Sequence, residues 1–411
     1  MQTKLNIFHL LWLVAVVGLL TSCSTDSAPE TSIDNDLDGI PGQSIRYVVN
    51  DISHGEPTRA AYEQLSQFSE TVLNARGGAV TKDNLIYSAG GGVWVTTENW
   101  SMPKSGNVTA YGISPTVDIL ADHLFDKSNH YFDYVVPTTD QTVIKIGSKL
   151  NFSASDIAAE GALVINFKNA TAFLTIRATN KLQLKLKNSD EKIPVQVYVK
   201  SVTLHNVKQK GRFTFSTTKN TDGSWALDDD VYANYTQELQ TPQLVTNGQT
   251  TPDDITDSLM VLLPQSPEGW AWAAKGNVNP DPGDAISVAD ADHKCYIELK
   301  CAITATIDSN TYYVWGSNNG GTITYESIYL PYNGRNASPK YSTVGAQGVY
   351  IVRITETTAL DLEGKPITPH ESTMADQFRD AEFINVSTGD EDGNDNVDDW
   401  EDEQVPEVVT L

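Results

Sequence analysis

A succession of short runs in which apolar and polar residues alternate constrains this chain more than any other feature. In residues 295–307, Cys-Tyr-Ile-Glu-Leu-Lys-Cys-Ala-Ile-Thr-Ala-Thr-Ile, every odd position is apolar and most even positions are polar. A period of two is typical of a strand with one buried face. Similar runs recur along the chain, separated by loops rich in Gly, Asn, Asp and Pro. They predict an all-β protein of sandwich type with few short helices.

The alternating runs also predict individual strands and some of their details. Runs 163–167 and 173–176 follow each other closely, and we expect them to pair. The run 195–199 alternates cleanly before Val202 and Leu204 shift its parity, which predicts a β-bulge. Other expected strands are 45–50, 93–97, 108–111, 259–263, 296–307, 312–315, 328–332 and 349–354.

The segment 60–74 allows two interpretations. Apolar residues recur there at helical spacing, at Ala61, Leu65, Phe68 and Val72, which favours a helix. A strand around residues 68–73 is the alternative. A weaker helical pattern lies near residues 373–381.

Two cysteines lie on the apolar face of the run 295–307. Cys295 and Cys301 are six residues apart, so about 20 Å separates them along an intact strand. A disulfide needs Cα atoms within about 7 Å. We therefore expect two small buried hydrophobic side chains that do not pair with each other.

The length of 411 residues, with 40% hydrophobic residues, fits two domains. The break is expected near residues 206–212, after one full set of strands. This gives an N-terminal sandwich at 44–208 and a C-terminal sandwich at 209–411, which ends in an acidic segment.

The first residues have the features of an export signal. Lys4 precedes an apolar stretch at 7–20, and Leu-Thr-Ser-Cys ends at Cys23. This tetrad is typical of a lipobox, so residues 1–22 would be removed and Cys23 acylated. The alternative is an ordinary secretory signal with a chance cysteine. Residues 23–43 are polar and acidic, which predicts a flexible tether.

The net charge of −25 makes nucleic acid a poor partner, because phosphate binding requires basic patches. Ten acidic residues lie between residues 390 and 407. Within them, residues 390–401 place oxygen ligands as a calcium loop would, although Asp395 stands where glycine makes the turn and Pro406 follows. A solvated acidic loop is the alternative.

Motifs that would indicate catalysis are missing from the sequence. The seven histidines are scattered, and neither a nucleophile elbow nor a phosphate-binding glycine loop occurs. We therefore expect no enzyme and no cofactor or metal. Trp270 and Trp272 share one face of an extended segment, where packing and sugar stacking are both open interpretations.

A series of short motifs follows an order that resembles the fimbrillin-like family, the lipoprotein-precursor subunits of Bacteroidales type V pili. The resemblance spans nearly all of the chain after Cys23. The motifs are Thr58-Arg59, Leu65 with Phe68, Val93-Trp94 with Trp100 and Pro103, Val108-Thr109-Ala110-Tyr111 with Pro115, Ile165-Asn166-Phe167, the segment 199–206, Leu262-Leu263-Pro264-Gln265, the segment 345–350, and Val397 with Trp400.

The resemblance implies two tandem β-sandwich domains of the transthyretin-like, Greek-key kind. It further implies export to the outer membrane on a lipid anchor and, after processing, a place in a fimbrium at the cell surface. In that family, an arginine-specific protease cuts after the first strand, and a strand from another subunit fills the exposed groove. This is β-strand addition.

Carried onto this sequence, the resemblance makes Arg59 the expected cleavage site, in a loop containing Gly55 and Pro57. Arg46 is the second choice, because it falls inside the expected first strand. The apolar residues near the C-terminus are candidates for the donated strand or for a last strand of their own sandwich, namely Val405, Val408, Val409 and Leu411.

The expected partners are other pilus subunits, the outer membrane before processing, and a host or bacterial surface ligand. The alternative function is that of a surface glycan-binding lipoprotein that does not polymerise.

Overall fold

The computed structural model describes residues 45–53, 65–103, 105–187, 189–267, 293–332, 344–370, 381–385 and 400–401. Strands dominate these residues, with one short 3₁₀ helix, η1 (Val117–Ile119), and one α-helix, α2 (Ala154–Glu160). The expected all-β class of sandwich type is confirmed. Within these ranges, no helix is both long and apolar enough to cross a bilayer.

A seven-stranded sheet forms one end of the molecule. Its strand order is β1-β9-β8-β5-β2-β3-β4, and β1 pairs in parallel with β9 whereas all other neighbours are antiparallel. A core on one face gathers Phe68, Ile86 and Phe167, with Ile157 of α2 packed against it. The strands are β1 (Tyr47–Asp51), β2 (Gln67–Asn74), β3 (Ala79–Gly90), β4 (Val93–Thr96), β5 (Val108–Ser114), β8 (Lys145–Phe152) and β9 (Leu163–Asn169).

Two further sheets, of five and seven strands, share the main core at the other end. In the first, β10 pairs in parallel with β23 and antiparallel with β16 and β17, and β25 pairs with β23. Its strands are β10 (Ala172–Asn180), β16 (Asp253–Asp254), β17 (Met260–Leu262), β23 (Gln347–Ile354) and β25 (Trp400–Glu401). Side chains of both sheets, such as Ile176 and Val197, belong to one buried cluster.

The second of these sheets is built around β12 (Lys192–Lys208), which pairs with β11, β15 and β18. Its other strands are β11 (Leu182–Lys185), β15 (Tyr232–Val245), β18 (Tyr296–Ile307), β19 (Asn310–Trp315), β22 (Glu326–Pro331) and β24 (Glu382–Asn385). A two-stranded hairpin of β20 (Ser317–Asn319) and β21 (Thr322–Thr324) follows β19.

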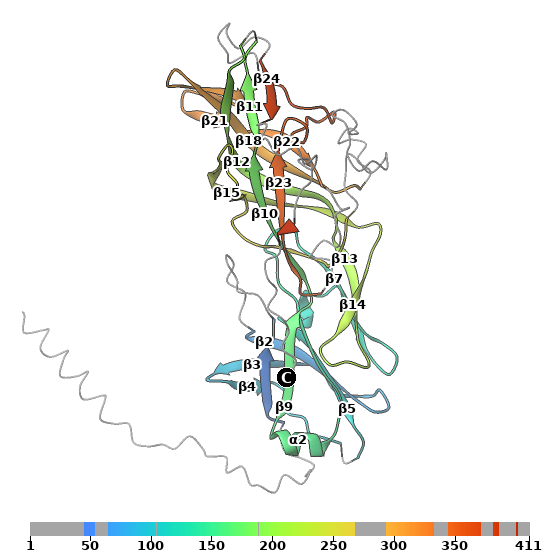
Figure 1. Cartoon of the computed structure of the whole chain (residues 1–411). Helices are drawn as coiled ribbons and strands as arrows, with labels where there is room; N and C mark the ends of the chain where they lie inside the picture. Colours follow the sequence, from blue (N-terminus) through green and yellow to red (C-terminus); the bar gives the residue numbers. More distant parts are fainter. Residues whose placement is uncertain are drawn as a thin grey trace, which may run out of the picture.

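A four-stranded sheet lies between the two ends (Figure 1). Its strands are β6 (Asp122–Phe125), β7 (His130–Val135), β13 (Lys210–Phe215) and β14 (Gly223–Leu227). Tyr111 of the first sheet stacks on Phe125 of this sheet, with ring centroids 5.1 Å apart. Both rings belong to, or pack against, the main core, which therefore reaches into the first sheet.

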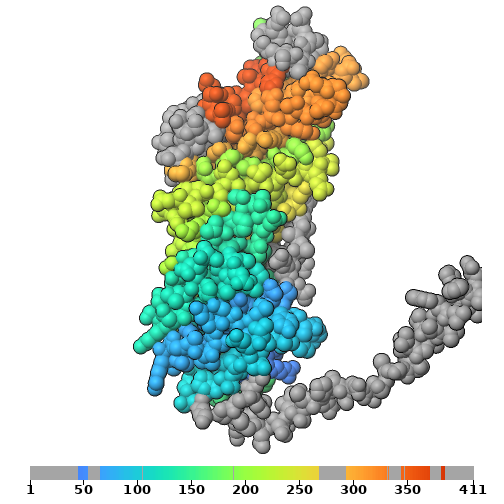
Figure 2. All heavy atoms as spheres, turned by 180° about the vertical axis from the view of Figure 1, so that it is seen from behind, coloured from blue at the N-terminus to red at the C-terminus, as the bar shows by residue number. Residues whose placement is uncertain are grey.

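The molecule is elongated, and its sheets succeed one another along the long axis (Figures 1 and 2). Figure 2 shows the early strands at one end and residues near 300–330 at the other. Strand β9 joins β10 through Ala170 and Thr171 alone, so the chain runs directly from the first sheet into the next. The expected pairing of runs 163–167 and 173–176 is therefore wrong.

The strand interpretation of residues 68–73 is confirmed, because residues 67–74 form β2. The helix expected over 60–74 is wrong where the chain is described, since tertiary packing buries both faces of this segment.

The bulge expected in β12 is confirmed by register shifts between Val199 and Ser201 against both neighbours. Cys295 and Cys301 are free and buried, as expected.

The domain break expected near residues 206–212 does not separate the sheets. Strand β12 ends at Lys208, yet it pairs with β15 and β18 of the expected C-terminal domain. Strand β10 likewise pairs with β23 along eight residues. Strands β10, β11 and β12 thus pair with β23, β24 and β18 respectively, because long-range pairing rather than chain order assigns a strand to its sheet.

Candidate functional site

Strand β1 occupies an edge of the first sheet, and among the strands that the structure describes it pairs with β9 alone. Tyr47 lies opposite Leu163 of β9, and Asp51 lies opposite Phe167. At the two ends of β1, the Leu163 amide donates to the Arg46 carbonyl at 2.8 Å, and the Ile52 amide donates to the Phe167 carbonyl at 2.7 Å. Main-chain hydrogen bonds of this kind hold any strand, whatever its side chains.

The side chain of Tyr47 is buried and completes a polar cluster inside the sheet. Its hydroxyl donates to Glu70 Oε2 at 2.5 Å. Trp100 Nε1 donates to the Tyr47 hydroxyl oxygen at 2.6 Å and also reaches Glu70 Oε2 at 3.2 Å. The three residues come from β1, β2 and the loop after β4, so β1 supplies one corner of a buried triangle.

Glu70 is fully buried, and burial raises the pKa of its carboxyl to about 7, although the donors Tyr47 and Trp100 oppose this rise. Its Oε1 atom has no hydrogen-bond partner among the residues that the structure describes. A buried carboxyl with one unpaired oxygen depends strongly on its remaining donors, because an unsatisfied polar group costs about 1–3 kcal/mol. Tyr47 is therefore the contact through which β1 stabilises this part of the core.

At the other end of β1, Asp51 forms an ion pair with Lys145 of β8. The Lys145 side chain is only 4% exposed, and that of Asp51 is 31% exposed. Partial burial acts to raise the pKa of Asp51, but hydrogen bonds from Lys145 and Ser53 outweigh it and lower this pKa. A buried cation needs a paired anion. Hence β1 supplies the counter-ion of Lys145.

A cavity of about 560 Å³ lies beside β1. Val49 and Asp51 line it from β1, and Trp94 lines it from β4. The remaining lining comes from Leu65, Ser66, Ser88 and the turn Gly90-Gly91-Gly92. Alternate side chains of β1 thus point inward. Tyr47 reaches the polar cluster, Val49 faces the cavity, and Asp51 reaches Lys145. We call β1 with Glu70, Trp100, Lys145 and this cavity the β1 site.

Arg46, the second choice for proteolysis, is exposed and directly precedes β1. The expectation that Arg46 lies inside the strand is wrong, because pairing with β9 begins at Tyr47. A cut after Arg46 would leave β1 attached to the chain through Ile52 and Ser53. Only a cut beyond Asp51 and before β2 would free the strand.

Other predicted site residues lie outside the described residues. These are Cys23, Arg59, Trp270, Trp272, Val405, Val408, Val409 and Leu411, and the expected calcium loop with the exception of Trp400 and Glu401. Trp400 and Glu401 form β25, opposite Tyr350 and Val349 of β23. Among the described residues, no three His, Cys, Asp or Glu side chains gather as metal ligands would.

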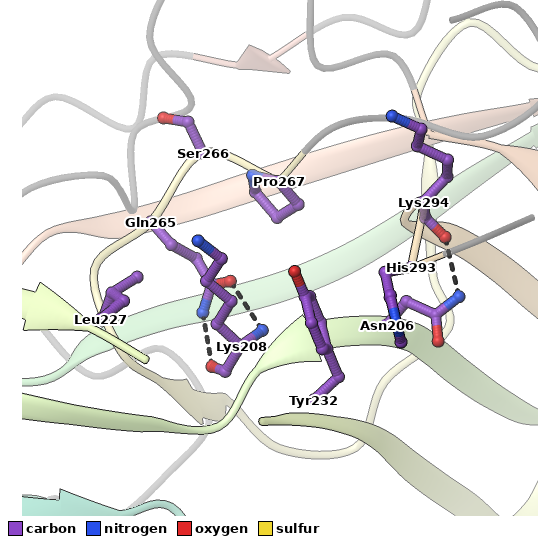
Figure 3. A pocket seen from close by; sticks show the side chains of 9 residues that line it. All are labelled: Asn206, Lys208, Leu227, Tyr232, Gln265, Ser266, Pro267, His293 and Lys294. Atoms are coloured by element: carbon purple, nitrogen blue, oxygen red, sulfur yellow. Dashed lines mark hydrogen bonds between the residues drawn. The ribbon is translucent and has the colours of Figure 1, made fainter. Parts of the chain in front are cut away.

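A second cavity of about 370 Å³ lies near the end of β12 (Figure 3). Tyr232 stacks on His293, with ring centroids 4.4 Å apart and an interplanar angle of 10°. Lys208 and Lys294 also line it. Figure 3 shows the Gln265 amide bridging to the backbone of Lys208, with hydrogen bonds of 2.9 Å.

Sequence reasoning did not predict the β1 site residues as a group. Trp100 served only as a landmark of the resemblance, and Glu70 was part of an expected helix or strand. One signal was present, since Glu70 is the single charged residue in the run Phe-Ser-Glu-Thr-Val-Leu. A lone acid in a buried run indicates a specific partner, but that partner lies 23 residues away in the sequence.

When the chain is compared with known proteins, similarity is found to solved structures alone. No family model matches the chain, and no curated protein matches it significantly. A candidate cell adhesion protein from Parabacteroides distasonis is 12% identical, with a TM-score of 0.40 over 81% of this chain and 90% of that one. A similar candidate from Bacteroides eggerthii is 10% identical, with a TM-score of 0.36 over 84% and 96%.

A fimbrilin from Porphyromonas gingivalis is 11% identical, with a TM-score of 0.32 over 83% of this chain and 96% of that one. These adhesion and fimbrial proteins are of the class that the sequence resembles. At such identities and TM-scores, the likeness does not assign the chain to a family.

Proposed function

We propose that this chain is a structural or adhesive subunit of a cell-surface pilus, assembled when proteolysis releases β1 and a strand of another subunit takes its place. The protein would act by binding and not by catalysis. The observation that carries this proposal is the position of β1, an edge strand whose side chains complete a buried polar cluster and a buried ion pair.

The physical reason is the state that loss of β1 would create. Without β1, strand β9 presents unpaired main-chain groups along a sheet edge, which is a template for another strand. Among the described residues, Glu70 would keep Trp100 as its one side-chain donor, and Lys145 would lose Asp51. Each loss is unfavourable, so the vacated site would bind a replacement strand strongly.

Arg59 is the arginine that fits this role. It lies in the segment between Ser53 and Leu65, the connection that must be cut to free β1. Cleavage there would remove Cys23 together with β1, and so detach the processed subunit from its proposed lipid anchor at the outer membrane. The segment bearing Val405, Val408, Val409 and Leu411 is our candidate for the strand that this subunit donates to another.

The test is the N-terminal sequence and intact mass of the protein recovered from the cell surface. We expect a chain beginning at Ala60 within high-mass assemblies. An Arg59→Ala variant should stay uncleaved and outside the assemblies, whereas Arg46→Ala should behave as wild type. A chain that still begins at Cys23, and is monomeric in the wild type, would contradict the proposal.

The alternative, a surface lipoprotein that binds glycans without polymerising, has one observation in its favour. The cavity beside Tyr232 combines stacked aromatic rings with polar side chains, which suits a sugar ring. The test of this alternative is a glycan screen on the whole chain, with the Tyr232→Ala variant as the control. Binding that Tyr232→Ala abolishes would support this alternative, and no binding would remove it.

A further inference from the structure

The β1 site holds three side chains of its strand by three different kinds of contact. Tyr47 gives and receives hydrogen bonds, Val49 faces the cavity, and Asp51 neutralises Lys145. Val48 and Asn50, the residues between them, are exposed, and Asn50 donates a hydrogen bond of 2.9 Å to Asn166 Oδ1 of β9 at the exposed surface. The inward contacts of the site are therefore with positions one, three and five of the strand that fills it, whereas the side chains at positions two and four face solvent, where water can replace a lost partner.

Position one requires a phenol. The oxygen must lie between a donor, Trp100 Nε1, and an acceptor, Glu70 Oε2, at 2.6 Å and 2.5 Å. A phenylalanine would fill the same volume but leave both groups without this partner. Sites built around a buried hydroxyl reject ligands that lack it.

Position five requires a carboxylate, because Lys145 is nearly buried and carries a positive charge. Position three requires an apolar residue, and the cavity of about 560 Å³ beside Val49 leaves room for a larger one. Building on the function proposed above, we infer that the replacing strand carries the pattern Tyr, any residue, apolar, any residue, Asp or Glu.

This pattern indicates the source of the strand. Among the seventeen tyrosines of the chain, Tyr47 alone is followed by an apolar residue two positions on and a carboxylate four positions on. The segment with Val405, Val408, Val409 and Leu411 contains no tyrosine. The occupant is thus a segment of a different protein that has this pattern, and not the C-terminal segment of a second copy.

The test uses the full chain with the recognition sequence of a site-specific protease inserted after Arg59. After cleavage, the freed N-terminal segment is separated in denaturant and the remaining chain is refolded. It is then incubated with fluorescent nine-residue peptides that copy residues 45–53, and binding is followed by anisotropy. The peptide variants are Tyr47→Phe, Asp51→Asn and, as the matched control at an exposed position, Val48→Thr. A fifth peptide copies residues 403–411.

We expect the native and Val48→Thr peptides to bind alike, and the Tyr47→Phe and Asp51→Asn peptides to bind at least tenfold more weakly. The peptide of residues 403–411 should not compete. In a Glu70→Leu protein, the penalty for Tyr47→Phe should shrink, because the acceptor is gone.

Equal binding of all variants of the native peptide would overturn the pattern while leaving strand replacement intact. Tight binding of the 403–411 peptide would overturn the inference of a different protein as the source. If the native peptide itself does not bind the cleaved protein, the proposed function fails, and this inference fails with it.

Discussion

The Tyr47 hydroxyl donates a 2.5 Å hydrogen bond to the fully buried carboxyl of Glu70, and so joins the edge strand of a sheet to its interior. Here the edge strand contributes a polar partner that the interior needs. Among the described strands β1 therefore pairs with β9 alone, yet the loss of β1 would take a hydrogen-bond donor from the buried carboxyl of Glu70.

Replacing Tyr47 by phenylalanine should lower the free energy of unfolding by about 1–3 kcal/mol, because Glu70 and Trp100 lose a buried partner. The measurement is equilibrium denaturation in urea. Tyr87→Phe is the matched control, since Tyr87 lies in β3 with 40% of its surface exposed. A Tyr47→Phe protein as stable as the control would show that the hydrogen bonds contribute little.

The raised pKa of Glu70 predicts a pH dependence of stability with a defined sign. Burial raises this pKa from 4.5 to about 7, so between these values the folded state holds a proton that the unfolded state has lost. The contribution of Glu70 to the free energy of unfolding is therefore fully present below pH 4.5. It falls by roughly 3 kcal/mol in total as the pH rises toward 7.

Glu70→Gln should remove this decline, because the amide does not titrate. The check is denaturation of both proteins at several pH values from 4 to 8, with Glu98→Gln, at an exposed site, as the control. The difference between wild type and Glu70→Gln isolates the one carboxyl from all others. A difference that stays constant with pH would contradict the raised pKa.

Asp51→Asn should destabilise the protein by about 1–3 kcal/mol, because the nearly buried side chain of Lys145 loses its counter-ion. The comparison is Glu160→Gln, which removes the partner of Lys149 in a more exposed pair and should cost less than about 1 kcal/mol. Thermal unfolding of both variants, measured in parallel, checks that Asp51→Asn loses more stability than Glu160→Gln. Equal losses in the two variants would argue against the ion pair as a special contact of β1.

The thiols of Cys295 and Cys301 should resist modification in the folded protein. Both side chains are fully buried, and burial raises the pKa of each thiol above its usual range, which disfavours the reactive thiolate. We expect Ellman's reagent to label neither cysteine at pH 8 until denaturant unfolds the main core. Labelling of either residue without unfolding would place that cysteine outside a stable core.

Sequence periodicity alone determined much of the local structure of this protein. Alternation over residues 295–307 predicted β18 and the burial of Cys295 and Cys301, and the parity shift at Val202 predicted the bulge in β12. These properties follow from the pleat, which assigns alternate side chains to opposite faces whatever the neighbouring strand is.

Tertiary structure alone decided which strands pair and what they bury. Only two residues separate β9 from β10, yet the two strands enter different sheets. Segment 67–74 could have been helix or strand until β3 and β5 paired with it. Glu70 meets Tyr47 because β1 closes against β9, more than a hundred residues later in the chain. Such contacts depend on the free energy of long-range pairing and burial, which no local pattern of residues contains.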